Sequence, residues 1–438
     1  MTDEFGNAVT TDHVATVKAL DAYAEEFLGY GANLPAIIQA ADADPGCALV
    51  NAHAAIVHMA LEAAKGHRSA ARYVARAEAA APRASRREQA VVAAARAWHD
   101  GRYDDLVEIH RQLAEAHPSD IVAAKWGQYH CFNRGAAEAM LRLAEAVRPA
   151  HEGTRYFQGL YAFALEQTGR LAEAEAAGRR AVEIEPADPW AHHAMAHVLE
   201  SAGRTDEGLD WLARFSPTWA GRGVFIRGHN WWHVALLRLD RAESEEALRI
   251  FDERLWGEYP EFSQEQIGAI SALWRFEMRA MEVGERWAPV AAKVREREYE
   301  HIEPFLDLHY LYALTRAGFD REASAFLSSL EAHAARVRPG LSHAWAGVAV
   351  HAARGVAAHA RRLYEPAFEA LNRVIDQMQA IGGSHAQRDL FLETWLDALV
   401  RLVGVERAGE LVRDRLSRTP QVAARSHLLA RRTRLAFA

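Results

Sequence analysis

Apolar residues recur every three or four positions along most of the chain, which is the period of an amphipathic α-helix. The stretch REQAVVAAARAWHDGRYDDLVEIHRQLAEAHPSD shows this pattern twice, with a short turn at HDGRYD. Pro118 ends the second helix because its ring cannot continue one, and Ser119 or Asp120 is suited to cap the next. β-Branched runs with a period of two, typical of strands, do not occur. The pattern predicts an all-α fold.

The middle of the chain repeats itself. Tyr156 and Trp190 begin two similar stretches, and the Gly-Arg pairs at Gly169 and Gly203 have the same separation as these two residues. That separation matches the tetratricopeptide repeat, in which two helices form one unit of about 34 residues. The two glycines stand where the first helix must turn into the second, and Pro186 closes the unit. The spacing predicts a tetratricopeptide-type superhelix of helix pairs.

The remaining segments are helical but less regular. Two looser pairs are HNWWHVALLRLDRAESEEALRIFDERL and PFLDLHYLYALTRAGFDREASAFLSSLEAHA. We expect irregular helix pairs over 1–150, tetratricopeptide repeats over 151–260 and further helix pairs over 261–438. Because stacked helix pairs share one continuous core, these divisions are soft. The predicted architecture is one α-solenoid enclosing a central pocket.

Composition and net charge limit the classes of molecule that the protein is expected to bind. The chain has 438 residues, 25% charged, and a formal net charge of -8 at pH 7, which disfavours nucleic acid and anionic membranes because both need a basic face. Its two cysteines, Cys47 and Cys131, form no disulfide framework. The N-terminal MTDEFGNAVTTD lacks the order of a signal peptide, and the longest uncharged stretch is too short and polar to span a bilayer. We expect a cytoplasmic protein with no membrane or nucleic-acid partner.

Several longer stretches resemble one family. They are GLYAFALEQTGRLAEAE, PADPWAHHAMAHVLE, GHNWWHVAL, EEALRIFD, ALWRFEMRAMEVGERW, HIEPFLDLHYLYAL and GGSHAQRD, in this order. Together they resemble the tetratricopeptide repeat protein 38 family over most of the chain. The resemblance implies an all-helical fold with few true repeats and a role in binding another molecule, with no settled activity or cofactor. His385 departs from the family, which often carries Asn or Asp there, and this puts any special role for His385 in doubt.

Two histidine pairs suggest a metal site. His193 and His197 lie four residues apart, as do His229 and His233, so each pair shares one helix face. Such pairs are good ligands for zinc or iron. Against this hypothesis, the chain has 22 histidines, so such pairs arise easily, and there is no HExxH motif. When the two repeats are aligned on their turns, the pairs are also offset by about three positions and need not converge.

A second hypothesis is a pocket without metal on the concave face, which holds a small polar or acidic ligand or a peptide. Arg388 would grip a carboxylate through two parallel hydrogen bonds. The candidate ligand-binding residues are His193, His197, Asn230, Trp232, Gln387, Arg388 and Asp389.

The same pocket is also compatible with an enzyme. General acid/base or metal-assisted hydrolysis or elimination would use His229, His233, Asp307 and His309. Asp307 and His309 are two residues apart and therefore point about 200° apart on a regular helix, so we expect them to have different partners. The sequence carries no GxSxG, no glycine-rich phosphate loop and no recognisable Cys-His pair. Sequence alone does not decide between an enzyme and a binding protein.

The third alternative is a protein-protein interaction scaffold whose histidines and tryptophans are structural. In this interpretation His192 is exposed, REREYEHIE is a solvated helix face, and Ser384 caps a helix with Gln387 at its third position. A homodimer remains open.

Overall fold

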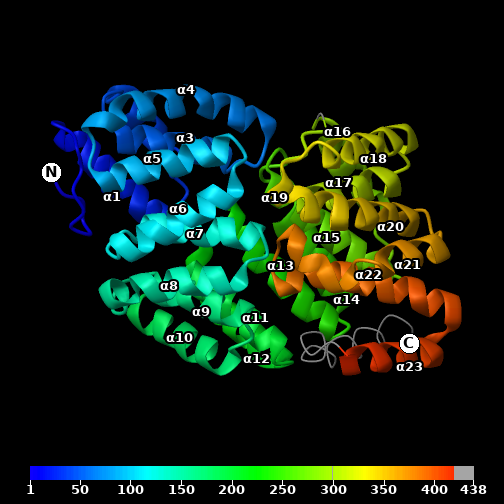
Figure 1. The fold of residues 1–438 in the computed structure, drawn as a ribbon. Coiled ribbons are helices and arrows are strands. Elements are labelled where there is room, and N and C mark those ends of the chain that lie inside the picture. Colours follow the sequence, from blue (N-terminus) through cyan, green and yellow to red (C-terminus); the bar gives the residue numbers. More distant parts are fainter. Residues whose placement is uncertain (298, 419–438) are drawn as a thin grey trace. The chain divides into compact units, whose positions relative to one another are not determined.

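The computed structural model describes residues 1–297 and 299–418, and these are almost entirely helical (Figure 1). Extended pairing within them is limited to two isolated bridges, Thr2 with Ala8 and Gly31 with Arg222. The predicted all-α, tetratricopeptide-like class is therefore confirmed. No helix in the described part of the chain is long and apolar enough to cross a membrane.

The first helices follow one another with short turns. Their bounds are α1 (Val14–Leu28), α2 (Ala36–Ala43), α3 (Ala48–Met59), α4 (Ala64–Ala80), α5 (Arg86–His99), α6 (Tyr103–Ala116), α7 (Ile121–Asn133), α8 (Ala137–His151), α9 (Phe157–Gln167), α10 (Leu171–Ile184), α11 (Pro189–Ser201) and α12 (Thr205–Phe215). Consecutive helices such as α7 and α8, or α9 and α10, pack as adjacent pairs (Figure 1).

The second half continues in the same manner. Its α-helices are α13 (Val224–Asp240), α14 (Ser244–Ile250), α15 (Ser263–Met278), α16 (Trp287–Arg295), α17 (Pro304–Arg316), α18 (Asp320–Ala334), α19 (Pro339–Ser342), α20 (Val350–Ala360), α21 (Tyr364–Asn372), α22 (His385–Val403) and α23 (Val405–Arg418). Two π-helical segments, Phe251–Leu255 and His343–Ala349, extend α14 and precede α20.

The chain forms two compact units. The first contains Met1–Met195 and Arg214–Arg227, and the second contains Ala196–Ala213 and the chain from Gly228 onward. The boundaries fall inside α11, α12 and α13, so each of these helices contributes to both units. The division into 1–150, 151–260 and 261–438 remains a prediction.

The turns between paired helices recur at a fixed interval in the first unit and just beyond it. The four glycines that make them follow one another at the tetratricopeptide period and all have positive φ, namely Gly101 (66°), Gly135 (65°), Gly169 (80°) and Gly203 (70°). Glycine adopts this left-handed conformation without the clash that a Cβ introduces. The regular spacing thus extends into the region that we expected to be irregular.

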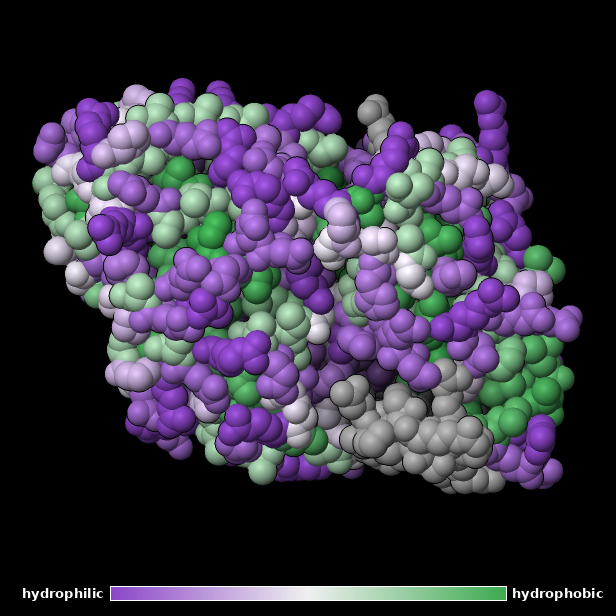
Figure 2. All heavy atoms as spheres, viewed as in Figure 1, coloured by the Kyte–Doolittle hydropathy of each residue, from purple (hydrophilic) through white to green (hydrophobic). Residues whose placement is uncertain are grey.

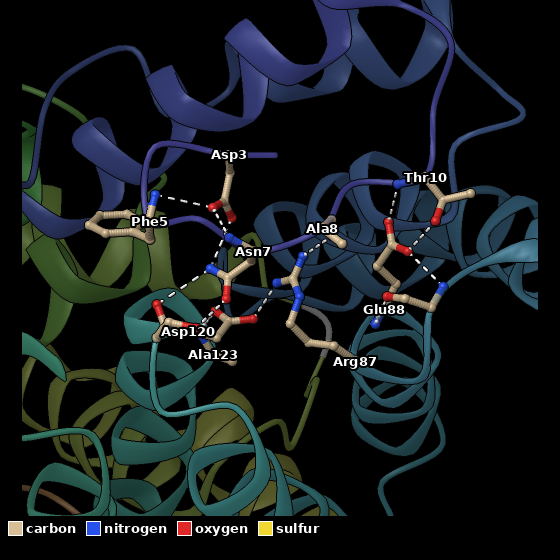
Figure 3. A network of polar contacts seen from close by, with 11 residues as sticks. Asp3, Phe5, Asn7, Ala8, Thr10, Arg87, Glu88, Asp120 and Ala123 are labelled. Atoms are coloured by element: carbon tan, nitrogen blue, oxygen red, sulfur yellow. Dashed lines mark hydrogen bonds and ion pairs between the residues drawn. The ribbon is translucent and has the colours of Figure 1, made fainter. Parts of the chain in front are cut away.

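A polar network holds the N-terminal segment against α5 and α7 (Figure 3). The guanidinium of Arg87 donates to the Asp120 carboxylate at 2.5 Å and to the carbonyl oxygen of Ala8 at 2.9 Å. The Glu88 carboxylate accepts from the backbone N–H and the hydroxyl of Thr10 at 2.8 and 2.6 Å. Since Arg87 and Asp120 are both buried, their charges compensate each other away from water.

Hydrophilic residues cover most of the face seen in Figure 2. The large apolar side chains that remain exposed in the described residues are few, and half of them belong to the end of α22 and to α23: Leu402, Val403, Val405 and Leu411. A mixed surface of this kind is ordinary for helical-repeat proteins, and we attach no function to it.

Candidate metal centre

Helix α11 carries the first histidine pair. Pro189 opens the helix, and the preceding Asp188 caps it by accepting the backbone N–H groups of Trp190 and Ala191 at 2.9 and 3.2 Å. One turn of helix separates His193 from His197, so both rings project from the same face. Both side chains are buried, each about 1% exposed.

Helix α13 carries the second pair. Trp232 is 2% exposed, and its ring lies 5.4 Å from the guanidinium carbon of Arg275. His233 is fully buried, whereas His229 is partly exposed. Their rings are in contact, with centroids 5.1 Å apart and planes at 89°. Asn230, between them in sequence, is also fully buried.

The two pairs converge on one point. His197 and His233 meet edge to face with ring centroids 4.5 Å apart. One ring nitrogen from each of His193, His197, His229 and His233 lies within 4.8 Å of the corresponding nitrogens of the other three. The offset between the repeats, which argued against convergence, therefore does not keep the histidines apart.

These distances suit a small cation. In tetrahedral zinc coordination the Zn–N bonds are about 2.0–2.1 Å, which places neighbouring ligand nitrogens about 3.3 Å apart. Nitrogens already within 4.8 Å need only small side-chain rotations to reach that separation. The donor set consists of imidazoles alone, which suits zinc, copper, nickel or iron better than calcium or magnesium.

The surroundings keep the site competent to bind a cation. Burial, reinforced by the proximity of His233 and His197, lowers the pKa of His229 well below its ordinary value. His229 is therefore neutral at pH 7, the form that donates a lone pair to a metal. A carboxylate oxygen of Glu200 lies 3.5 Å from Nδ1 of His233, with both side chains 1% exposed. Metal-bound histidines commonly turn their second nitrogen toward such a carboxylate.

Asp307 and His309 have different partners, as expected from their spacing. A carboxylate oxygen of Asp307 lies 2.5 Å from Nδ1 of His301, in the loop before α17. Nδ1 of His309 instead donates to the carbonyl oxygen of Phe305 at 2.8 Å. Burial, opposed by that hydrogen bond, lowers the pKa of His309 to about 4. The partner of Asp307 is therefore His301, a residue that the sequence did not single out.

The GGSHAQRD segment is a helix start. Ser384 and Gln387 form the expected reciprocal capping box at the beginning of α22, with bonds of 3.2 and 2.9 Å. The guanidinium of Arg388 donates to the carbonyl oxygen of Gly383, and Asp389 is buried. These contacts explain the segment by local structure, and a ligand-binding role for Gln387, Arg388 and Asp389 remains a prediction.

Two expectations about single segments are wrong. His192 is fully buried: its Nε2 lies 3.0 Å from the carbonyl oxygen of Pro186, and its Nδ1 accepts from the Trp219 indole at 3.1 Å. The REREYEHIE segment is not a solvated helix face, because α16 ends at Arg295 and His301 is 9% exposed. The many charged residues of this segment suggested an exposed helix face, and a loop has no periodic pattern by which the sequence could reveal it.

A surface hollow of about 520 Å³ lies away from the histidines in sequence, on α8, α9 and α10. Its lining includes Arg148, Tyr161 and Arg180. None of the predicted site residues lines it. The histidine centre is thus a cluster of side chains within packed helices, whereas the sequence predicted a pocket on the concave face.

Comparison with known proteins finds distant structural similarities, which are too weak to carry a conclusion about this chain. No family model matches the chain. The human IFIT1 dimer with m7Gppp-AAAA is 13% identical, with 95% of this chain and 91% of that one covered and a TM-score of 0.43. A monomeric mutant of IFIT1 with Gppp-AAAA is 12% identical, with 95% and 98% covered and a TM-score of 0.41. At this distance their ligands belong to those proteins alone. The chain is an all-helical protein of tetratricopeptide-like type.

Proposed function

We propose that this protein is a tetratricopeptide-type binding protein that holds a divalent transition-metal ion, zinc in the first place, between α11 and α13. The observation that supports the proposal is the approach of four imidazole nitrogens to within 4.8 Å of one another. Buried histidines in a packed core more often donate singly to a backbone oxygen, as His309 does. Four rings turned toward one point are instead the arrangement that a cation requires.

The exposure of the four rings favours a particular use of the metal. His193, His197 and His233 are buried, whereas His229 is partly exposed. Release of His229, the partly exposed ligand, from the ion would open the fourth position to water or a carboxylate. A small acidic ligand would then bind through the metal, which unites the metal hypothesis with the predicted small-ligand site.

The family resemblance, the absence of a nucleic-acid partner and the cytoplasmic location are parts of the same proposal. The resemblance to the tetratricopeptide repeat protein 38 family is consistent with a binding role and assigns no metal. The net charge of -8 supports a cation and disfavours nucleic acid as partner. A cytoplasmic location fits the two unpaired cysteines, Cys47 and Cys131, which are both buried.

The test is metal analysis of the full chain, purified without a histidine tag. We expect about one zinc per chain after dialysis against trace metal, measured by plasma mass spectrometry. His197→Ala and His233→Ala should each weaken zinc binding at least about 100-fold in competition with a chromophoric chelator. His343→Ala is the matched control, because His343 is exposed and outside the cluster.

The outcomes separate the alternatives. Zinc bound equally well by His197→Ala, with its helicity intact, would contradict the proposal. A wild-type chain that takes up no zinc, copper, nickel or iron would also contradict it and would favour structural histidines. If His197→Ala unfolds, the zinc affinity of the His229→Gln variant decides between the alternatives. His229 is partly exposed, so this substitution removes a ligand without opening the core.

A further inference from the structure

A second polar cluster lies outside the metal centre, within the second unit. His301 stands in the loop between α16 and α17, and its two ring nitrogens have two different partners. Nδ1 lies 2.5 Å from a carboxylate oxygen of Asp307 on α17. Nε2 lies 2.8 Å from the hydroxyl oxygen of Ser329 on α18. The three side chains therefore form a chain in the order carboxylate, imidazole, hydroxyl.

This order is the one that activates a serine. The carboxylate holds the Nδ1–H tautomer, so that Nε2 carries the lone pair that accepts the hydroxyl proton. Asp307 is about 1% exposed, and its burial fixes the direction of the imidazole. Ser329 is partly exposed, so its oxygen is within reach of solvent. The carboxylate, the imidazole and the hydroxyl thus have the exposure that each role requires.

The backbone at the histidine is unusual. His301 has a φ of 47°, in the left-handed region that residues with a Cβ rarely adopt. Tyr299, two residues earlier, has a φ of 52°. Such conformations are strained and persist where neighbouring contacts hold them. At His301 the ring is held by its hydrogen bonds with Asp307 and Ser329 and by its contact with the ring of Phe326.

The face of α18 beside Ser329 is aromatic. Phe326 and His333 lie three residues before and four residues after Ser329, on the same side of the helix. Their ring centroids are 5.4 and 5.1 Å from that of His301. Burial, with His301 and Arg336 as lesser causes, lowers the pKa of His333 to about 4, so that the ring is neutral at pH 7. These neighbours suit an uncharged acyl group.

We propose that Ser329, His301 and Asp307 form a nucleophilic triad that attacks small carboxylic esters with an apolar acyl group. Ser329 Oγ bonds to the carbonyl carbon while its proton passes to Nε2 of His301. Collapse of the tetrahedral intermediate breaks the bond to the leaving alkoxide, which takes that proton from His301. Water then repeats the sequence on the acyl-serine and releases the carboxylic acid, so Ser329 regains its proton. This site is independent of the metal centre.

The test is phosphonylation of the full chain by a fluorophosphonate probe, in which the Oγ–P bond forms, the P–F bond breaks and fluoride leaves. We expect peptide mass analysis to place the label on Ser329. Ser329→Ala should abolish labelling and the hydrolysis of p-nitrophenyl butyrate, and Asp307→Asn should slow both about 100-fold or more. Ser328→Ala is the matched control, because the Ser328 hydroxyl donates to the Ser324 carbonyl on the exposed side of α18.

Several results would overturn the triad. They are an unlabelled wild-type chain, a label on Ser328 at the same rate as on Ser329, or full labelling in folded Asp307→Asn. If Ser329→Ala loses helicity, the triad is still tested, because the residue that carries the label in the wild-type chain identifies the nucleophile. Addition of a zinc chelator should leave the labelling rate unchanged, which keeps this test separate from that of the metal centre.

Discussion

The rings of His197 and His233 meet edge to face with their centroids 4.5 Å apart, although the two residues belong to successive helix pairs of the chain. Neither residue alone carries a functional signal, since single buried histidines are common in helical cores. Because these two rings meet, the pair His193 and His197 and the pair His229 and His233 form one cluster that could hold a metal ion.

Glu200 should tune the metal affinity without supplying a ligand. Its carboxylate lies 3.5 Å from Nδ1 of His233 and would accept that N–H once Nε2 binds the ion. Glu200→Gln keeps the shape and removes the charge, so we expect zinc binding about 10–100-fold weaker at unchanged stoichiometry. Chelator competition measures this, with exposed Glu245→Gln as the control. Unchanged affinity in Glu200→Gln would remove Glu200 from the centre.

Asp188 should make stability depend on pH. Burial raises its pKa from 3.8 to about 7, opposed by the backbone N–H groups of Ala191 and Trp190. Between these values the folded chain binds more protons than the unfolded chain, so the contribution of Asp188 to stability falls as pH rises. Asp188→Asn removes this loss. Relative to wild type, its free energy of unfolding should rise between pH 5 and 7, by about 1.4 kcal/mol per unit at the steepest, and then level off.

Urea titrations at pH 5, 6, 7 and 8 check the Asp188 prediction, and only the pH dependence of the difference is used. A constant cost of the substitution therefore cancels. A difference that stays flat or falls from pH 5 to 8 would contradict the raised pKa of Asp188.

The buried pair of Arg87 and Asp120 should be costly to break. Arg87→Met leaves the Asp120 carboxylate without its cation and the Ala8 carbonyl without its donor. We expect a loss of about 3–5 kcal/mol in the free energy of unfolding. Arg111→Met is the surface control: Arg111 pairs with Glu108 and Glu115, all well exposed, and its removal should cost less than about 1 kcal/mol. Equal losses in the two variants would contradict the distinction.

One later inter-helix turn, between α13 and α14, has alanine at the left-handed position and should gain stability from glycine there. Ala242 has a φ of 59° at the turn between α13 and α14 and is exposed. Ala242→Gly relieves the left-handed strain and should stabilise the protein by about 0.5–1 kcal/mol. The reverse change, Gly169→Ala, should destabilise it by about 1 kcal/mol through the backbone alone, because nothing lies within 4 Å of the added Cβ. Denaturation midpoints of both variants measure the difference.

The repeat architecture could be predicted because its signals are local. Helical periodicity, the turn at Gly169 and Gly203, and the capping box of Ser384 with Gln387 each depend on neighbouring residues. The same turn signal was present at Gly101 and Gly135, two repeat periods and one repeat period before Gly169. It would have extended the repeats into the segment 1–150.

The meeting of the histidines could not be predicted in the same way. The turn at Ala242 follows that at Gly203 by more than one repeat period, so alignment on turns misplaces α13. Helix α13 has 17 residues, against 13 for α11. The position of one packed helix along the axis of its neighbour depends on how their side chains pack, and the positions of the turns do not predict it. His301 was missed for a related reason, because its loop has no period and its partner Ser329 is distant in sequence.

The chain passes from one compact unit to the other three times, and each crossing lies within a helix, at Met195–Ala196 in α11, Ala213–Arg214 in α12 and Arg227–Gly228 in α13. A single proteolytic nick therefore cannot release either half, and neither half can be expressed alone without leaving a severed helix end. Fragments designed at the apparent border should therefore aggregate, because each would carry severed helix ends.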